Sequence, residues 1–261
     1  MEYVYLCFKI IFLRYFIELS YLGKNYHGWQ IQPNVITVQK KVNEAFSKIL
    51  NTPVLTTGAG RTDTGVHASQ MFVHIDTDVK IDSDQYIYKI NSVLPDDIVI
   101  HDIFLVKEDA HTRFSATLRS YEYSIYQGRN VFNLDTTWQI FKQEIDVDKM
   151  NDAASILKNY TNFKCFSKSK TDVQTYNCKI TNAVWEKKGN NLTFYITADR
   201  FLRNMVRAIV GTLVDIGIGK SSIDDLITII ESEDRSMAGT SAPAQGLSLT
   251  VVKYPESIRH E

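Results

Sequence analysis

The chain lacks an excess of charge of either sign. Its 29 lysines and arginines are balanced by 30 aspartates and glutamates, which gives a formal net charge of −1 over 261 residues. This balance excludes a protein that attracts nucleic acid through overall positive charge. Any contact with RNA would need a local basic surface, with acidic residues segregated to another part of the molecule.

Cysteine is scarce as well. Cys7, Cys165 and Cys178 form no Cys-x-x-Cys pair, and no histidine stands at metal-ligand spacing from them. An odd number of widely spaced cysteines argues against a disulfide framework and for reduced thiols in a cytoplasmic protein. The sequence therefore predicts neither a disulfide-stabilised fold nor a metal site.

Long hydrophobic runs are also missing. Residues 4–13 are apolar apart from Lys9, but this run is too short to span a membrane, and no other segment comes closer. Glu2 precedes the run and no small-residue cleavage site follows it, which disfavours a signal peptide. We expect residues 1–13 to be a dispensable N-terminal extension, or the product of a start codon assigned too early.

Strand-like and helical segments alternate through the rest of the chain. Period-two alternation predicts strands, and apolar residues spaced by three and four predict helices. The predicted strands cover residues 15–21, 71–76, 98–106, 120–126, 192–198 and 247–253. The predicted helices cover residues 38–50, with Thr37 as N-cap, and residues 84–94, 148–160, 206–214 and 222–232.

The order of these segments predicts an α+β fold. We expect two ferredoxin-like halves with mainly antiparallel sheets, placed side by side. The first half would span residues 14–110 and the second residues 111–256, followed by a tail of residues 257–261. No residue-level repeat accompanies the two halves, so the duplication is inferred from the elements alone.

A glycine-rich loop is the most informative stretch of the chain. Gly58, Gly60 and Gly65 let the backbone turn tightly around Arg61 and Asp63. A guanidinium beside a carboxylate favours the charged form, which suits a nucleophilic or electrostatic role better than that of a general acid. By itself the loop could equally be an ordinary surface turn. A phosphate-binding loop is disfavoured, because no Gly-Lys-Ser/Thr is present and Asp63 would repel a phosphate.

Several short motifs favour a functional role for this loop over an ordinary surface turn. The word Gly60-Arg61-Thr62-Asp63-Thr64-Gly65-Val66-His67-Ala68 resembles the signature of the tRNA pseudouridine synthase A family, and the resemblance covers about residues 14 to 255. Other words occur in the expected order: Gly28-Trp29-Gln30-Ile31-Gln32-Pro33, Arg113-Phe114-Ser115-Ala116, Arg119-Ser120-Tyr121-Glu122-Tyr123, Phe201-Leu202-Arg203-Asn204-Met205-Val206-Arg207 and Pro243-Ala244-Gln245-Gly246-Leu247. The segment Tyr21-Leu22-Gly23-Lys24-Asn25 departs from the family pattern, where an acidic residue and a glycine more often follow the tyrosine.

The resemblance implies roles for individual residues. Asp63 would be the catalytic residue, in a cleft between the two halves. Tyr121 would stack on the target uracil, which suits a base flipped out of its helix, although a core tyrosine is the alternative. Arg207 would pair with the aspartate through its fork of donors, although it could also be a solvated flank of its helix. Arg61 would brace the loop or help to flip the base.

The remaining candidates follow from charge. Arg203 lies one turn before Arg207 and would face RNA phosphate or water. Lys164, Lys168 and Lys170 lie in a Ser/Lys-rich run interleaved with Phe163 and Phe166, and we expect either phosphate contacts or a solvated loop.

By resemblance, the reaction is the isomerisation of uridine to pseudouridine at positions 38–40 of the tRNA anticodon stem-loop. No cofactor or metal is implied, because uracil is both leaving group and returning nucleophile. The implied partners are tRNA and a second copy in a homodimer, with no membrane, in the cytoplasm. The alternatives are a catalytically inactive RNA-binding protein on the same scaffold, or a pseudouridine synthase for another structured RNA. The joint presence of Asp63, Tyr121 and Arg207 favours the enzyme.

Overall fold

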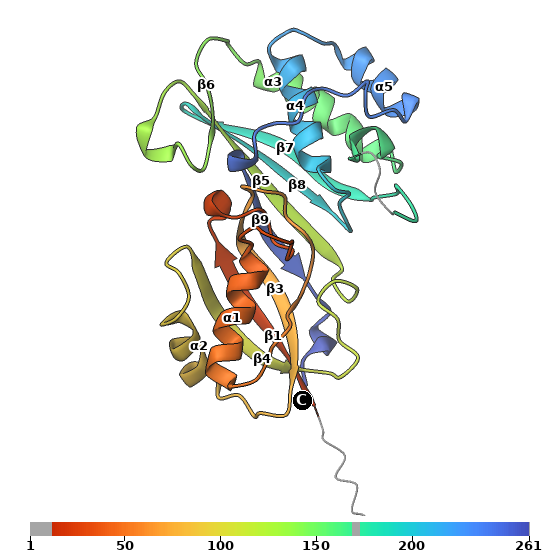
Figure 1. Cartoon of the computed structure of the whole chain (residues 1–261). Helices are drawn as coiled ribbons and strands as arrows, with labels where there is room; N and C mark the ends of the chain where they lie inside the picture. Colours follow the sequence, from red (N-terminus) through yellow and green to blue (C-terminus); the bar gives the residue numbers. More distant parts are fainter. Residues whose placement is uncertain (1–11, 169–172, 261) are drawn as a thin grey trace, which may run out of the picture.

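One open, mixed sheet runs through the whole molecule (Figure 1). The computed structural model describes residues 12–168 and 173–260, and within them the sheet order is β4-β1-β3-β9-β5-β8-β7, with β2 beside β3 and β6 beside β5. The strands are β1 (Leu13–Tyr21), β2 (Thr57–Gly58), β3 (His67–Thr77), β4 (Ile98–Val106), β5 (Leu118–Gln127), β6 (Trp138–Ile140), β7 (Ile180–Lys188), β8 (Asn191–Ala198) and β9 (Leu247–Lys253). The α-helices in the described part are α1 (Val38–Leu50), α2 (Ser83–Asn91), α3 (Val147–Ile156), α4 (Met205–Gly217) and α5 (Ile223–Ser232).

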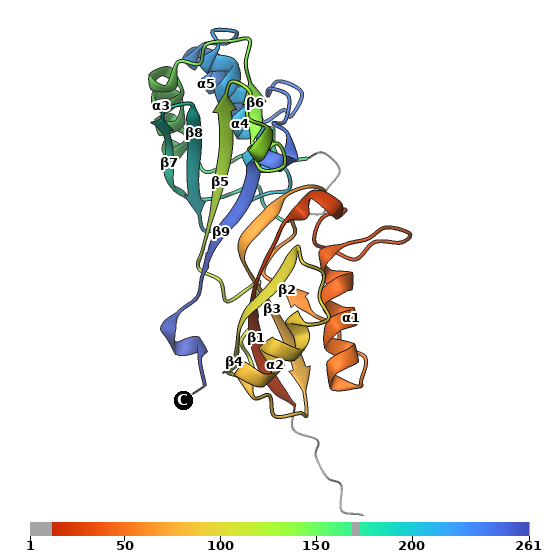
Figure 2. The ribbon, with the colours of Figure 1, turned by 90° about the vertical axis from the view of Figure 1, so that its left-hand side faces the viewer.

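The last strand of the chain lies in the middle of this sheet and joins its N-terminal strands to its C-terminal strands. β9 pairs in parallel with the start of β3, where His67 lies opposite Ser248, and antiparallel with β5. The helices α1 and α2 lie with β1, β3 and β4, whereas α3, α4 and α5 lie with β5, β7 and β8 (Figure 1, Figure 2). The start of β3, which follows the glycine-rich loop, is therefore attached directly to the C-terminal part of the chain.

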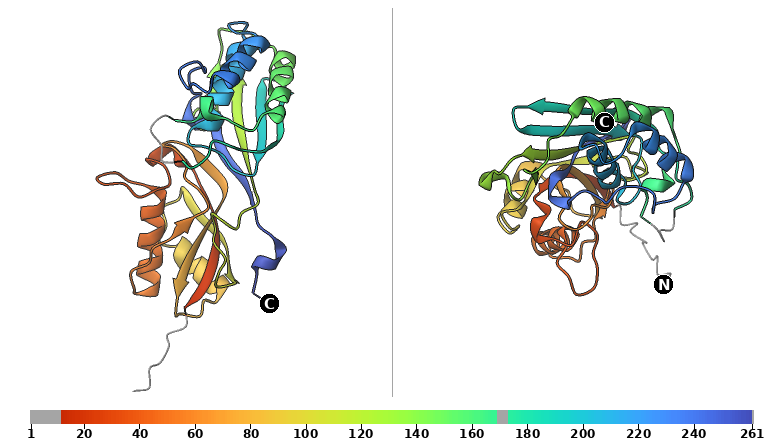
Figure 3. Two further views of the ribbon diagram at one scale, coloured as in Figure 1. Left: turned by 90° about the vertical axis from the view of Figure 1, so that its right-hand side faces the viewer. Right: turned by 90° about the horizontal axis from the view of Figure 1, so that it is seen from above.

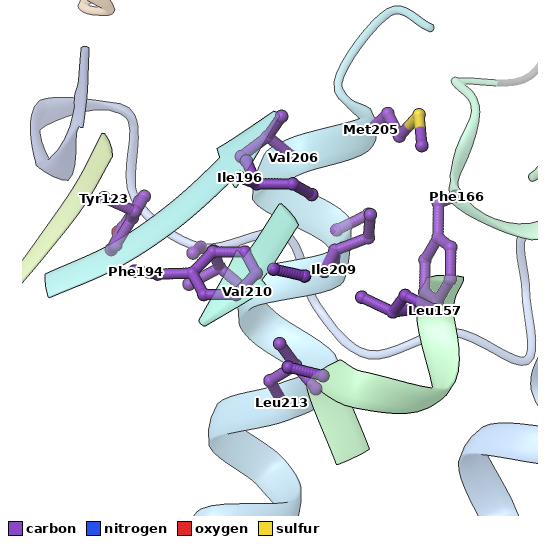
Figure 4. Packing of buried hydrophobic residues seen from close by; sticks show 14 of the residues in the cluster. Tyr123, Leu157, Phe166, Phe194, Ile196, Met205, Val206, Ile209, Val210 and Leu213 are labelled. Carbon is purple, nitrogen blue, oxygen red and sulfur yellow. The ribbon is translucent and has the colours of Figure 1, made fainter. Parts of the chain in front are cut away.

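Two separate clusters of buried side chains form the core. The C-terminal cluster packs α4 against β8, and the N-terminal cluster packs α1 against β1 and β3. Figure 4 shows the apolar stripe of α4, with Val206, Ile209, Val210 and Leu213 lying among Phe194, Ile196, Leu157 and Phe166. Strand β9 contributes to both clusters, because Leu247 belongs to the C-terminal cluster and Leu249 to the N-terminal one. Tyr121 packs against both clusters, which places it where they meet.

In the C-terminal part, the helices cover one face of the sheet only. On β5 and β8, Tyr123, Ile125, Phe194 and Ile196 are buried against the helices. The alternate side chains of the same strands, with Glu122 among them, line an open groove of about 290 Å³ on the other face. Tyr121 points to the helical face, because it lies two residues before Tyr123 on the strand.

Local signals placed most elements correctly. α1 has the predicted bounds and Thr37 caps it by accepting a hydrogen bond from Lys40 N. The strands predicted at 98–106 and 247–253 are confirmed to the residue. Two helices are shorter than predicted: α2 ends at Asn91, and α3 ends at Ile156, after which the chain tightens into a 3₁₀ turn over Leu157–Asn159. β2, β6 and β7 were not predicted.

Within the described residues, no helix has the length and apolar character needed to cross a membrane.

Candidate active site

Hydrogen bonds on both sides of Asp63 hold the 58–66 loop in place. Thr62 O accepts from Trp29 N at 3.3 Å, and the buried Thr62 hydroxyl lies 2.8 Å from the Tyr21 hydroxyl. Gly65 N donates to Tyr26 O, and Val66 N donates to the backbone oxygen of Asp63 itself. The Asp63 side chain therefore projects from a backbone that neighbouring segments fix on either side.

Two glycines make this tight loop possible. Gly65 has φ +78°, a conformation that residues with a Cβ rarely adopt. Gly28 has φ +82°, and a Cβ there would lie 2.4 Å from Thr62 O. The close approach of the 26–29 segment to the 58–66 loop therefore explains the glycine of the Gly28-Trp29-Gln30 word.

Two arginines face the Asp63 carboxylate, Arg207 from the first turn of α4 and Arg203 from the segment just before this helix. Arg207 Nη1 lies 3.5 Å from Oδ2, and Arg203 Nε lies 3.8 Å from Oδ1. Asp63 retains a quarter of its exposed area and Arg207 about as much, whereas Arg203 is more than half exposed. The expected contact between Arg207 and Asp63 is thus present. However, each arginine contacts a different oxygen of the carboxylate, so Arg207 does not form a bidentate ion pair with Asp63.

The polypeptide around Arg207 explains how it is aimed. Its Nε donates to Ala242 O at 2.7 Å, and Ala242 N donates back to Arg207 O at 2.9 Å. Asn204, with φ 65°, ends the segment that leads into α4 and bonds Ser241 through its side chain. The segment before the Pro243-Ala244-Gln245-Gly246 word therefore acts as a support for Arg207.

Tyr121 lies at the boundary of the two cores and faces the same region. Its ring packs edge-on against Phe201, with ring centroids 5.1 Å apart. Burial raises the pKa of Tyr121 to about 12; the Arg119 charge opposes this rise and the Asp63 charge adds to it. The phenol is therefore protonated at neutral pH, and it lies within the electrostatic reach of Asp63.

The other predicted residues are placed as follows. Arg61 is exposed, and no partner for it occurs in the described part of the chain. Lys168 is exposed, and its backbone N–H donates to Arg203 O. Lys170 lies outside the described residues. Lys164 is 3.7 Å from Glu233, and Phe163 and Phe166 are fully buried, so these rings are not available for stacking on bases.

Arg119 is a site residue that the motifs did not reveal. Its guanidinium donates to four backbone carbonyls: Arg113 O at 2.6 Å, Asp199 O at 2.9 Å, Ala116 O at 3.2 Å and Ala59 O at 3.3 Å. Ala59 belongs to the 58–66 loop, and Asp199 precedes the segment that carries Arg203. One side chain thus ties together three segments around Asp63. Arg119 precedes Tyr121 by two residues, so its position on the same face of the strand was a signal available in the sequence.

We expect Arg119→Lys to lower kcat at least about tenfold with a smaller change in the KM for tRNA, because an ammonium cannot reach carbonyls spread around a planar fork. Steady-state kinetics beside thermal unfolding measures this. Arg129→Lys is the matched control, since Arg129 is an exposed arginine that lies over the Phe141 ring. A wild-type kcat in Arg119→Lys would show that the four hydrogen bonds of Arg119 are dispensable for the site.

In the part of the chain that the structure describes, cysteines and other potential ligands form no metal centre. Burial raises the pKa of Cys165 and of Cys178 to about 12, which leaves both thiols protonated. Across residues 12–168 and 173–260, no three or more His, Cys, Asp or Glu side chains come close enough together to hold a metal ion.

Comparison with known proteins assigns the chain. Residues 153–255 match the family model described as tRNA pseudouridine synthase. The tRNA pseudouridine synthase A of Parabacteroides distasonis is 46% identical over 94% of this chain and 97% of its own length. The proteins of the same name from Porphyromonas gingivalis and Ruminiclostridium cellulolyticum are 48% and 39% identical, over 94% and 91% of this chain and 98% of each relative. The chain belongs to the tRNA pseudouridine synthase A family and is an isomerase that acts on tRNA.

Proposed function

We propose that this enzyme converts uridine to pseudouridine at positions 38–40 of the tRNA anticodon stem-loop, with Asp63 as the catalytic residue. The observation that carries the proposal is the Asp63 carboxylate, held by its backbone and faced by Arg203 and Arg207, in the electrostatic reach of Tyr121. In the reaction the bond between the ribose and N1 of uracil breaks, the base turns, and the ribose is bonded to C5. The proton of C5 leaves to solvent, and N1 gains one.

Two roles of Asp63 are chemically consistent with this reaction. Its carboxylate either attacks the ribose or removes a ribose proton to give a glycal. In both, the carboxylate acts as an electron-pair donor and must be held at the ribose while the base turns. Arg207, anchored at Ala242 O, orients the carboxylate, and Arg203 supplies a second positive charge at its other oxygen.

The other residues bind the RNA. Tyr121 offers an aromatic ring for the flipped uracil, and Arg61 is exposed in the loop beside Asp63, where it can take the place that the base leaves. Lys168 joins Arg203 at the rim of the site through its backbone, and we include Lys170 with it as a phosphate contact.

Charge favours the helical face of the sheet for this binding. Two grooves on the opposite face are lined by acidic side chains, namely Glu122 and Glu186 in one, and Glu122, Asp96 and Asp97 in the other, which has a volume of about 430 Å³. Phosphates would be repelled there, whereas Arg203 and Arg207 lie on the helical side. A net charge of −1 is thus compatible with tRNA binding if the RNA contacts the side of Arg203 and Arg207 and avoids these acidic grooves.

Mapping of pseudouridine in tRNA from cells that lack this protein tests the assignment. We expect modification at positions 38–40 to disappear, and purified protein to restore it on unmodified tRNA. Pseudouridine retained at these positions but lost from another RNA would favour the alternative substrate, and no loss anywhere would favour an inactive RNA-binding protein.

The assembly and organisation of the chain are part of the proposal. We infer a homodimer with two-fold symmetry, because an L-shaped tRNA extends well beyond one 261-residue chain. We also infer two ferredoxin-like halves, residues 14–110 and 111–256, which the two core clusters support, and a cytoplasmic location, where tRNA is found. Light scattering at micromolar concentration tests the dimer, and a fully active monomer would refute it.

A further inference from the structure

A short loop projects from the molecule between β1 and α1. Residues 30–36 extend away from the sheet on the side of α1, as two views from opposite sides agree (Figure 2, Figure 3). Gln32, Pro33 and Asn34 are exposed at its end. Ile31 and Ile36 are 42% and 51% exposed, although isoleucine is among the residues most often buried.

The base of this projecting loop is attached to the 58–66 loop. His27 N donates to Ile36 O at 2.9 Å and closes the projection. At the base of the loop, the backbone N–H of the buried Trp29 donates to Thr62 O, and Gly28 packs on the backbone of Thr62 and Asp63. The projecting loop therefore begins next to the segment that carries Asp63.

Hydrogen bonds rather than apolar contacts hold the projecting loop in shape. Ile31 N donates to the Gln39 side chain at 3.0 Å, and Gln32 Nε2 donates to His27 O at 2.9 Å. Asn34 makes the turn at the tip with φ 61°. The loop thus presents its two isoleucines in a fixed arrangement, and the core does not use them.

The charge around the loop suits a polyanion. Residues 19–43 contain no aspartate or glutamate, although the chain has 30 of them. They include the exposed Lys40, and also Lys24 and Lys41, which pair with Asp135 and Glu44 outside the segment. A loop that docked on a basic protein surface would be expected to carry carboxylates. Amides, isoleucines and a proline without acidic residues instead match an RNA helix, whose minor groove is wide and shallow and displays 2′-hydroxyls.

We propose that residues 30–36 bind the minor groove of the RNA helix that adjoins the target uridine. Ile31 and Ile36 lie against the sugars, in the manner of apolar side chains that enter a minor groove, and the amides of Gln32 and Asn34 face the 2′-hydroxyls. These contacts read the shape of the helix and not its sequence. The inference rests on the proposed function, because it takes Asp63 as the place of the target uridine.

The first test is the variant Ile31→Ser/Ile36→Ser. We expect its KM and Kd for unmodified tRNA to rise about tenfold, by more than kcat falls, with unfolding temperature unchanged. Leu55→Ser is the matched control, since Leu55 is 82% exposed in the turn between α1 and β2, and it should behave as wild type. Unchanged tRNA affinity in the double variant would overturn the proposal.

The second test locates the contact. With p-benzoylphenylalanine at position 31, irradiation should crosslink the protein to tRNA at nucleotides of the helix next to the modified uridine, and the same probe at position 55 should not. A crosslink between two protein chains in place of RNA would refute RNA binding and identify a protein interface.

Activity of the same preparations separates the two proposals. If wild type forms pseudouridine, Asp63→Asn does not, and the isoleucine variant binds tRNA normally, only the role of the projecting loop fails. If Asp63→Asn retains turnover, the proposed active site itself fails.

Discussion

Replacement of Asp63 by asparagine is expected to lower kcat by at least about 10³-fold, because the variant loses the electron-pair donor that both proposed routes require. The fold should be unaffected. Asparagine has nearly the same size, and Asp63 contacts the protein through two long ion pairs at 3.5 and 3.8 Å and through its backbone oxygen. Affinity for tRNA should stay equal or increase, since Arg203 and Arg207 are left without their counter-charge.

Pseudouridine formation on unmodified tRNA, measured in single-turnover reactions, tests this expectation, with a filter-binding Kd as the second measurement. Asp102→Asn is the matched control, because Asp102 is a partly exposed carboxylate on the edge strand β4, 3.8 Å from Arg259 and outside the proposed site. Turnover of Asp63→Asn within tenfold of wild type would remove Asp63 from the chemistry.

Elements with an unbroken hydrophobic period could be predicted from the sequence, and the reason is local. The stripe of α4 and the alternation of β8 arise from one buried face each, so the period alone identifies them. β7 was missed because its pairing with β8 shifts register between Ile180 and Asn182, which breaks the alternation of buried and exposed residues. α3 ended early because its last turn tightens into a 3₁₀ helix, which the spacing of apolar residues does not reveal.

The position of β9 could not be predicted in this way. Its sequence predicts a strand, but its partners, β3 on one side and β5 on the other, are each separated from it by well over 100 residues of sequence. Strand order depends on which faces and edges the rest of the fold leaves free, and no residue of β9 encodes that. The expectation of two halves with sheets side by side therefore did not include one sheet that continues through both.

The candidate site also combines features that could be predicted from the sequence with features that could not. Asp63 was predicted from a motif within one loop, and its pairing with Arg207 only from resemblance, since nothing local links the two residues. The sharing of the carboxylate between Arg203 and Arg207 follows from the turn at Asn204, whose positive φ the sequence does not display. Arg119 was missed because an arginine on a strand is usually solvent-exposed, whereas here four carbonyls surround it.

Tyr121→Ala should have the second largest effect, through binding and rate together. Loss of base stacking costs roughly 1–3 kcal/mol, which corresponds to a rise in the Kd for tRNA of about 5- to 150-fold. The side chain also packs between both core clusters and against Phe201, so its removal leaves a cavity and lowers the free energy of unfolding. A loss of activity in this variant alone would therefore mix two causes.

Tyr121→Phe separates these causes, because phenylalanine fills the same space and stacks equally well. We expect its tRNA affinity and unfolding temperature to match wild type. If the hydroxyl transfers a proton at C5, kcat of Tyr121→Phe falls while KM does not; if the ring only stacks, kcat is retained.

With its pKa raised to about 12, the Tyr121 hydroxyl stays protonated, so it should contribute no change in kcat between pH 7 and about pH 10. Tyr88→Ala, at an exposed ring on α2, is the control, and normal turnover by folded Tyr121→Ala would reduce Tyr121 to a packing residue.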